Sequence, residues 1–223
     1  MKVRPILFSA PMVRAILDGT KTQTRRVVKA KHLPRLENSV LNFLDGKWNQ
    51  RPLPYGQTGD RLWARETCRA EELSDGLDGV RYLADDGFVS IQPNEDGINR
   101  WLEMRDYGNR PNTVARVKTV PAIHMPRWAS RITLEVTGVR VERLQDISEA
   151  DAIAEGIESL TYGGQTTYRD YSLSDELAAV SPMLKSPIAS YRSLWASING
   201  PGSWDANQWV WVVEFRRVEG GAA

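Results

Sequence analysis

Residues 130–143 carry the strongest strand signal in the chain. The apolar side chains of Ile132, Leu134 and Val136 alternate with polar ones, which is the two-residue period of a strand with one apolar face. Residues 208–218 are nearly apolar throughout, as is typical of a strand buried on both faces. Both segments therefore predict long strands.

The shorter elements mix strands and helices without a regular βαβ rhythm, which favours a small mixed α+β barrel over a doubly wound sheet. Ser148, with Asp151 three residues later, predicts a capped helix start, and Gly19 and Gly200 suit helix ends. Loops are expected at residues 86–101 and 159–174. The expected strands cover residues 4–9, 59–68 and 80–85, and the expected helices cover residues 9–20, 147–157, 174–182 and 186–200.

Composition limits the classes of function. The chain has 223 residues, 41% of them hydrophobic and 8 of them Trp, so it can bury a sizeable core. Its net charge of +1 excludes steering of nucleic acid by the whole molecule, so any nucleic-acid binding must use a local patch. With one Cys, Cys68, and two His, we expect no disulfide, metal or cofactor. No segment is long and apolar enough for a signal peptide or membrane span, so we expect a cytoplasmic protein that does not bind a membrane.

Functional groups crowd into the segment ILDGTKTQTRRVV, residues 16–28. Lys21 and Thr24 lie three residues apart, and Arg25 and Arg26 follow. A Thr hydroxyl is a poor nucleophile near neutral pH unless a base lies within hydrogen-bond reach, and a desolvated lysine can serve as that base. The segment therefore predicts a site that activates a hydroxyl or holds an anion. The simpler alternative is a solvated loop followed by an ordinary strand Thr.

Glu155 is the candidate carboxylate for this site. A carboxylate could carry the proton from the base to a leaving amine, although spacing alone cannot join Glu155 to Lys21 and Thr24. Glu155 ends a short predicted helix just before Gly156, and a negative charge is poorly matched to that end of a helix. This mismatch indicates that another group holds Glu155. The alternative is a solvated side chain.

Two further segments combine aromatic and charged residues. In LWARET, Trp63, Arg65 and Glu66 occupy adjacent strand positions, so Arg65 and Glu66 point to opposite faces and one of them must face inward or be paired. A structural ion pair and a ligand contact are both compatible with this pattern. The segment MPRWASR suits base stacking combined with phosphate contact, and its candidates are Arg127, Trp128 and Arg131.

Taken together, four segments resemble the ASCH domain family, a relative of the PUA fold. The segments are PILFSAPMVRAILDGTKTQTRR, GDRLWARET, RITLEVTGVRVERLQDISEADAIAEGI and YRSLWASINGPGSWDANQWVWVVEF. In length the chain is similar to the larger ASCH proteins of phages and prophages. The resemblance implies a small PUA-like β-barrel with flanking helices. It also implies one domain, residues 1–223, with insertions at about residues 29–58, 69–127 and 159–187.

The resemblance also implies a function. Small bacterial members of the family include N4-acetylcytidine amidohydrolases, which use a lysine and a threonine of a G-x-K-T-x-T-x-R segment and a glutamate from a later short helix. That segment begins at Gly19 here and supplies Lys21, Thr24 and Arg26, and the glutamate matches Glu155. The expected function is hydrolysis of an N-acylated cytosine nucleoside or nucleotide. The alternatives are a non-catalytic module that binds RNA or a modified nucleoside, with Arg25, Arg26, Arg127, Trp128 and Arg131 on its binding face, and an ASCH-type ribonuclease.

Overall fold

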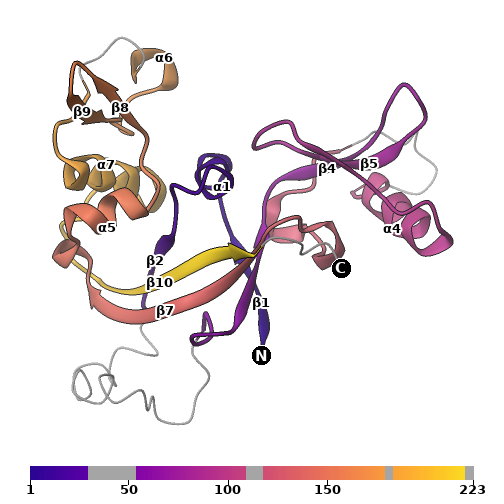
Figure 1. The fold of residues 1–223 in the computed structure, drawn as a ribbon, viewed down its shortest axis with the longest axis horizontal. Coiled ribbons are helices and arrows are strands. Elements are labelled where there is room, and N and C mark those ends of the chain that lie inside the picture. The colour runs from indigo at the N-terminus through magenta and orange to yellow at the C-terminus, as the bar shows by residue number, and fades with distance from the viewer. Residues whose placement is uncertain (30–53, 109–117, 179–182, 219–223) are drawn as a thin grey trace. The chain divides into compact units, whose positions relative to one another are not determined.

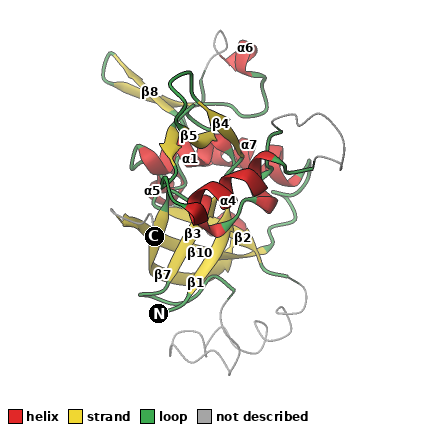
Figure 2. Ribbon diagram, turned by 90° about the vertical axis from the view of Figure 1, so that its right-hand side faces the viewer, coloured by secondary structure: helices red, strands yellow, loops and turns green. Residues whose placement is uncertain are grey.

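The computed structural model describes residues 1–29, 54–108, 118–178 and 183–218, which form a mixed α+β fold (Figures 1 and 2). Two compact units alternate along the chain. The first unit comprises residues 1–2, 15–60 and 135–216, and the second comprises residues 3–14, 61–134 and 217–223. The expected organisation as one ASCH-type domain stays a prediction.

Three strands form the sheet of the first unit: β2 (Gln23–Val27), β7 (Thr133–Arg143, in the first unit from Glu135 on) and β10 (Trp209–Val218). The strand β10 lies between β7 and β2, and β7 and β10 run side by side in Figure 1. The pairing of β10 with β2 is antiparallel and sets Val212 opposite Arg25 and Val213 opposite Thr24. Since side chains alternate along a strand, Arg25 and Thr24 point to opposite faces of this sheet.

Two helices pack against each other in the first unit (Figure 1): α5 (Glu149–Ala154) and α7 (Pro187–Asn199). The Ser148 hydroxyl caps α5 by accepting from the Asp151 backbone amide, and α7 ends at Gly200. Their apolar faces join the side chains of β10 in a buried cluster that includes Ala152, Tyr191, Trp195, Trp204, Val210 and Val212. The unit also contains a hairpin, β8 (Ser159–Tyr162) and β9 (Gln165–Tyr168), the short helix α6 (Asp175–Ala178) and a 3-10 turn, Leu144–Asp146.

The second unit contains a parallel pair of strands and a separate antiparallel sheet. The pair is β1 (Val3–Leu7) and β3 (Arg61–Arg65), and the helix α1 (Ala10–Leu17) begins in this unit and ends in the first. The sheet consists of β4 (Cys68–Glu72), β5 (Asp78–Tyr82) and β6 (Phe88–Ser90), in that order. The helix α4 (Glu95–Arg105) contributes Trp101 and Met104 to the core of this sheet. Two 3-10 turns follow, Ala122–His124 and Arg127–Ala129.

Most of the expected elements are confirmed, but two expected loops are wrong. Residues 86–101 contain β6 and most of α4, and residues 159–174 contain the β8–β9 hairpin. The helix α4 buries only Trp101 and Met104, and every residue of β8 is exposed. Neither segment therefore shows the apolar period on which the prediction depended. Most of the expected insertion at residues 29–58 lies outside the described residues.

The expected α+β class is confirmed, whereas the PUA-like barrel is not. No closed barrel is present in the described ranges. Among the described helices, none combines the length and the apolar character that a membrane crossing requires.

Candidate functional site

The structure brings Lys21 and Glu155 together, although 134 positions separate them in the chain. Lys21 lies between α1 and β2, and its backbone forms an isolated β-bridge with that of Glu155. The Lys21 ammonium donates to the Glu155 backbone carbonyl at 2.7 Å and to its carboxylate Oε2 at 2.9 Å. Lys21 is only 2% exposed and Glu155 only 3%. The two residues therefore form a buried ion pair within the first unit.

A second cation holds the other oxygen of the same carboxylate. The Arg25 guanidinium donates to Glu155 Oε1 at 3.1 Å and also pairs with Glu142 and with Asp151. Glu155 is the C-cap residue of α5, where the negative helix end disfavours a carboxylate. Lys21 and Arg25 are the groups that hold it there, as the sequence mismatch indicated.

Burial governs the electrostatics of Lys21. Desolvation lowers the pKa of Lys21, because the ammonium has lost its contact with water. The charge and hydrogen bond of Glu155 raise that pKa, and the charges of Arg26 and Arg25 lower it further. The net result is a pKa below the ordinary value of 10.5. Lys21 is therefore easier to deprotonate than a lysine in water.

Thr24 is buried, with 1% exposure, but the structure does not join it to the pair. In the described part of the chain, no hydrogen bond links the Thr24 hydroxyl to Lys21 or Glu155. Thr24 lies on β2 between Gln23 and Arg25, and both of those side chains reach α5 or its C-cap. Because strand side chains alternate, Thr24 faces the other side of the sheet. Its expected place in a shared cleft stays a prediction.

The sequence analysis missed Tyr191, which lies beside this cluster. Tyr191 is 3% exposed, and its ring centroid lies 5.9 Å from the Arg25 guanidinium carbon. Contacts with the rings of Trp195 and Trp204 fix it in the core. Burial raises the pKa of Tyr191 well above 10.0, and the charge of Glu155 raises it further. The four-residue spacing of Tyr191 and Trp195 on α7 could have marked both as one buried face.

The Tyr191 hydroxyl has no hydrogen-bond partner among the described residues. Such a hydroxyl can donate to a polar group that reaches it.

The remaining candidates lie in the second unit. Glu66 is paired with the Arg131 guanidinium by two bonds of 2.9 Å, which confirms the structural ion pair that was one of the two expected uses of this carboxylate. Arg131 also binds Asp85 and lies 4.1 Å from the Tyr82 ring centroid. Arg131 is thus already neutralised by carboxylates of its own unit.

Trp63 is flanked by two guanidinium groups in the second unit. The guanidinium carbons of Arg65 and Arg127 lie 5.3 and 5.5 Å from its ring centroid, and Arg65 also donates to the Ile123 carbonyl. Trp63 and Arg65 come from one of the two predicted segments and Arg127 from the other, and their meeting was not predicted. Their role in ligand binding stays a prediction.

Neither a metal cluster nor a reactive thiol is present among the described residues. In the described ranges, no group of three or more His, Cys, Asp and Glu side chains could hold a metal ion. Burial raises the pKa of the Cys68 thiol to about 12, so Cys68 stays protonated and poorly nucleophilic near neutral pH. The buried Lys21–Glu155 pair is the arrangement best suited to proton transfer.

Comparison with known proteins returned no match: no protein-family model, no curated protein and no solved structure is similar to this chain. The ASCH resemblance therefore rests on the four sequence segments alone.

Proposed function

We propose that the chain is an amidohydrolase that removes the acyl group from an N4-acylated cytosine nucleoside or nucleotide in the cytoplasm. The observation that carries the proposal is the buried Lys21–Glu155 pair. Removing two charges from water is costly, and ionisable groups with shifted pKa values are concentrated at functional sites. The ASCH resemblance supplies the substrate class and the PUA-like barrel that we propose for the fold.

The proposed reaction starts from neutral Lys21 and protonated Glu155, the state reached when the Lys21 proton moves to the Glu155 carboxylate. The Lys21 amine takes a proton from the Thr24 hydroxyl once that hydroxyl comes within hydrogen-bond reach, or from a water that Thr24 orients, and the resulting oxygen nucleophile attacks the acyl carbonyl carbon. The bond between this carbon and the cytosine N4 breaks as Glu155 gives a proton to the leaving amine. When Thr24 itself attacks, water then hydrolyses the acyl-threonine and releases the acid. The 2.9 Å distance from Lys21 Nζ to Glu155 Oε2 allows the proton to return directly from Lys21 to Glu155.

Arg25 has a positioning role in this scheme. It holds Glu155 Oε1 while Lys21 holds Oε2, so the carboxylate cannot rotate without losing both contacts. Its positive charge also favours release of the Lys21 proton. Arg26, which belongs to the same unit, is proposed to hold or orient the ligand.

A binding module without catalysis is the second candidate. The Thr24 side chain faces away from the sheet surface on which Arg25 holds Glu155, and binding of RNA or a modified nucleoside needs no activated hydroxyl. An ASCH-type ribonuclease is a third candidate, which the same activity tests distinguish.

Release of cytidine from N4-acetylcytidine tests the proposal. We expect Lys21→Arg and Thr24→Ala each to lower kcat by on the order of a hundredfold or more, since arginine stays protonated and alanine has no hydroxyl. Thr22→Ala is the matched control, because Thr22 is an exposed threonine of the same segment. Wild-type protein that binds N4-acetylcytidine without releasing cytidine would favour the binding module. Full activity of Lys21→Arg would exclude lysine as the base.

A further inference from the structure

A pocket of about 210 Å³ lies in the second unit, and no residue of the Lys21–Glu155 cluster lines it. Its walls come from β5, β6, the first turns of α4 and the turn at Trp128. Drug-sized ligands usually occupy about 300–1,000 Å³, so this pocket admits a single ring system. It is built largely from residues 69–127, which the ASCH resemblance leaves unexplained.

The walls of the pocket are fixed by buried contacts. The Tyr82 hydroxyl donates to the Ala129 carbonyl at 2.6 Å, which ties β5 to the turn that carries Trp128. The Trp101 indole donates to the Gly79 carbonyl at 2.9 Å and so anchors α4 on β5. The shape of the pocket therefore does not depend on a ligand.

The pocket combines an aromatic wall with free polar groups. Trp128 is partly buried against the core of this unit and lines the pocket together with Val80 and Val89. Around them, the Gln92 amide and the Ser90 hydroxyl form no hydrogen bond with any described residue. A side-chain amide can pair with the donor and acceptor edge of a nucleobase, and an aromatic wall can stack on its ring.

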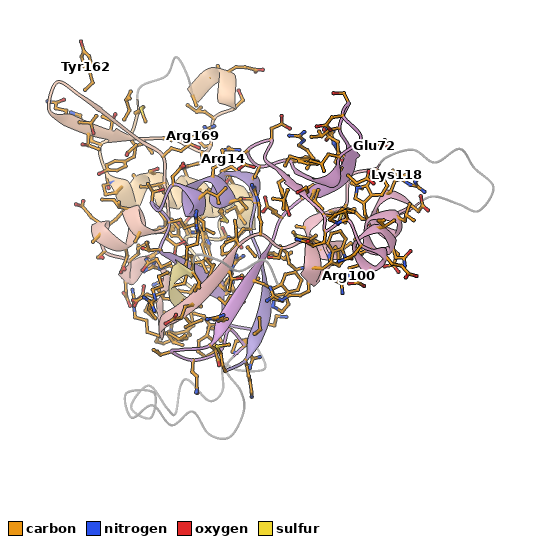
Figure 3. All side chains as sticks on the ribbon, turned by 45° about the vertical axis from the view of Figure 1, so that its right-hand side comes forward. Arg14, Glu72, Arg100, Lys118, Tyr162 and Arg169 are labelled. Atoms are coloured by element: carbon orange, nitrogen blue, oxygen red, sulfur yellow. The ribbon has the colours of Figure 1, made fainter. Side chains whose placement is uncertain are left out.

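A second pocket, of about 150 Å³, shares Trp128 and Arg100 with the first. It also contains His124 and Tyr107, whose rings lie 5.7 Å apart. Arg100, labelled in Figure 3, forms a 2.7 Å pair with Asp96 on the exposed surface of α4. Exposed pairs of this kind contribute little, so an entering phosphate can replace Asp96.

We propose that these two pockets hold two consecutive bases of a single-stranded nucleic acid. Trp128 stacks against a base, the Gln92 amide pairs with a base edge, and the Arg100 guanidinium binds the phosphate that joins the two nucleotides. An aromatic platform beside a basic group is the usual arrangement for binding single strands. Two pockets that share Trp128 and Arg100 fit a dinucleotide better than one free nucleoside. The proposal does not depend on the proposed amidohydrolase activity.

Calorimetric titration of the full chain with adenosine and with the RNA dinucleotide ApA tests this proposal. We expect ApA to bind at least tenfold more tightly than adenosine, which corresponds to about 1.4 kcal/mol. Arg100→Gln is expected to weaken ApA binding at least fivefold and to leave adenosine binding unchanged, because adenosine has no phosphate. Adenosine binding as tight as ApA binding would overturn the two-base proposal.

Two further variants separate ligand binding from folding. Ser90 is an exposed strand residue that lines the pocket, so Ser90→Trp places a bulky side chain there without removing any core group. We expect the binding of both ligands to weaken at least tenfold. Asn99→Ala is the control, because Asn99 is exposed on α4 but lines neither pocket, and wild-type affinity is expected. Unchanged affinity in Ser90→Trp, or no binding of either ligand to the wild type, would overturn the proposal.

Discussion

At the residue scale, Lys21 depends on one partner, whereas Glu155 has two. Both hydrogen bonds of the Lys21 ammonium go to Glu155, and Arg25 binds the other carboxylate oxygen. Breaking a buried pair is strongly destabilising when it leaves an uncompensated charge. The two single substitutions of this pair therefore have unequal consequences.

We expect Glu155→Gln to lower the free energy of unfolding by about 3–5 kcal/mol at neutral pH, because it leaves the Lys21 charge buried without a counter-charge. Lys21→Met is expected to cost less, since Arg25 still neutralises Glu155. The loss in Glu155→Gln should shrink as pH rises, because a lysine with a lowered pKa sheds its proton in the folded state. Urea unfolding at several pH values measures both effects. Equal losses in the two variants would contradict this account.

Tyr191 offers a second test at the residue scale. Since its hydroxyl has no partner among the described residues, Tyr191→Phe is expected to change the free energy of unfolding by less than about 0.5 kcal/mol. If this hydroxyl donates to the substrate, kcat/KM for N4-acetylcytidine should fall by up to about tenfold. Tyr171→Phe is the matched control, because the Tyr171 hydroxyl accepts from the Glu158 backbone amide at 2.7 Å and its loss should cost about 1 kcal/mol. A stability loss in Tyr191→Phe as large as that in the control would show that the hydroxyl has a structural role.

At the element scale, Gly156 lets the end of α5 approach Lys21. Gly156 has a φ of +78°, and an added Cβ would lie 2.7 Å from the Lys21 Cβ and 2.8 Å from the Ala15 Cβ. Gly19 has a similar φ of +76°, but an added Cβ there would meet no atom within 4 Å. The two glycines thus share the same left-handed backbone conformation and differ in the space around them.

We expect Gly19→Ala to cost about 1–2 kcal/mol, which is the cost of a left-handed conformation for a residue with a Cβ. Gly156→Ala should cost about 1–3 kcal/mol more, because the new methyl group is overpacked. It should also lower amidohydrolase turnover, since Lys21 must shift away from Glu155. Thermal unfolding and the cytidine-release assay together provide the comparison. Similar losses in the two variants would mean that α5 can move away without consequence.

The elements that the sequence predicts are those that carry a local signal of their own. The strand β7 and the helix α5 carry their own signals, an apolar alternation in one and the Ser148 cap in the other. The β8–β9 hairpin shows no alternation of buried side chains, because all residues of β8 are exposed and Tyr162 points away from the ribbon in Figure 3. Its local signal is the two-residue turn Gly163–Gly164, in which both glycines have a positive φ.

The candidate site was predicted only in part. The position of Glu155 at the C-terminal end of a helix indicated that a cation holds it, but periodicity cannot identify which residue supplies that cation. Lys21 came from the crowding of functional groups after Gly19 and from the family motif, whereas Tyr191 looks like any core aromatic residue in the sequence. Contacts between distant segments depend on packing, which local patterns do not encode.

At the scale of the whole molecule, the net charge is +1, and several charged side chains are neutralised by ion pairs inside their own unit. Arg25 binds three carboxylates in the first unit, and Arg131 binds two in the second. These guanidinium groups are therefore neutralised where they lie and add little to attraction of a nucleic acid. Binding must use exposed groups such as Arg100, so we expect it to be local.

The response to alkaline pH follows from buried neutral groups in both units. Burial raises the pKa of the Cys68 thiol from 9.0 to about 12, and it also raises the pKa values of Tyr82 and Tyr191 above 10.0. Above pH 9–10 the unfolded chain loses these protons while the folded chain keeps them, so the unfolded state binds fewer protons and stability falls as pH rises. Each such group contributes up to about 1.4 kcal/mol per pH unit. Lys21 acts in the opposite direction, but only up to its unfolded pKa near 10.5.

We therefore expect the free energy of unfolding in urea to decline from about pH 10 to pH 11, with more than one group contributing to the slope. Tyr82→Phe should flatten the decline by up to about 1.4 kcal/mol per pH unit, although it lowers stability at neutral pH by removing the bond to the Ala129 carbonyl. Stability that rises over this range would mean that Lys21 and groups like it outweigh the buried hydroxyls. A Tyr82→Phe curve parallel to that of the wild type would mean that Tyr82 reaches water before it ionises.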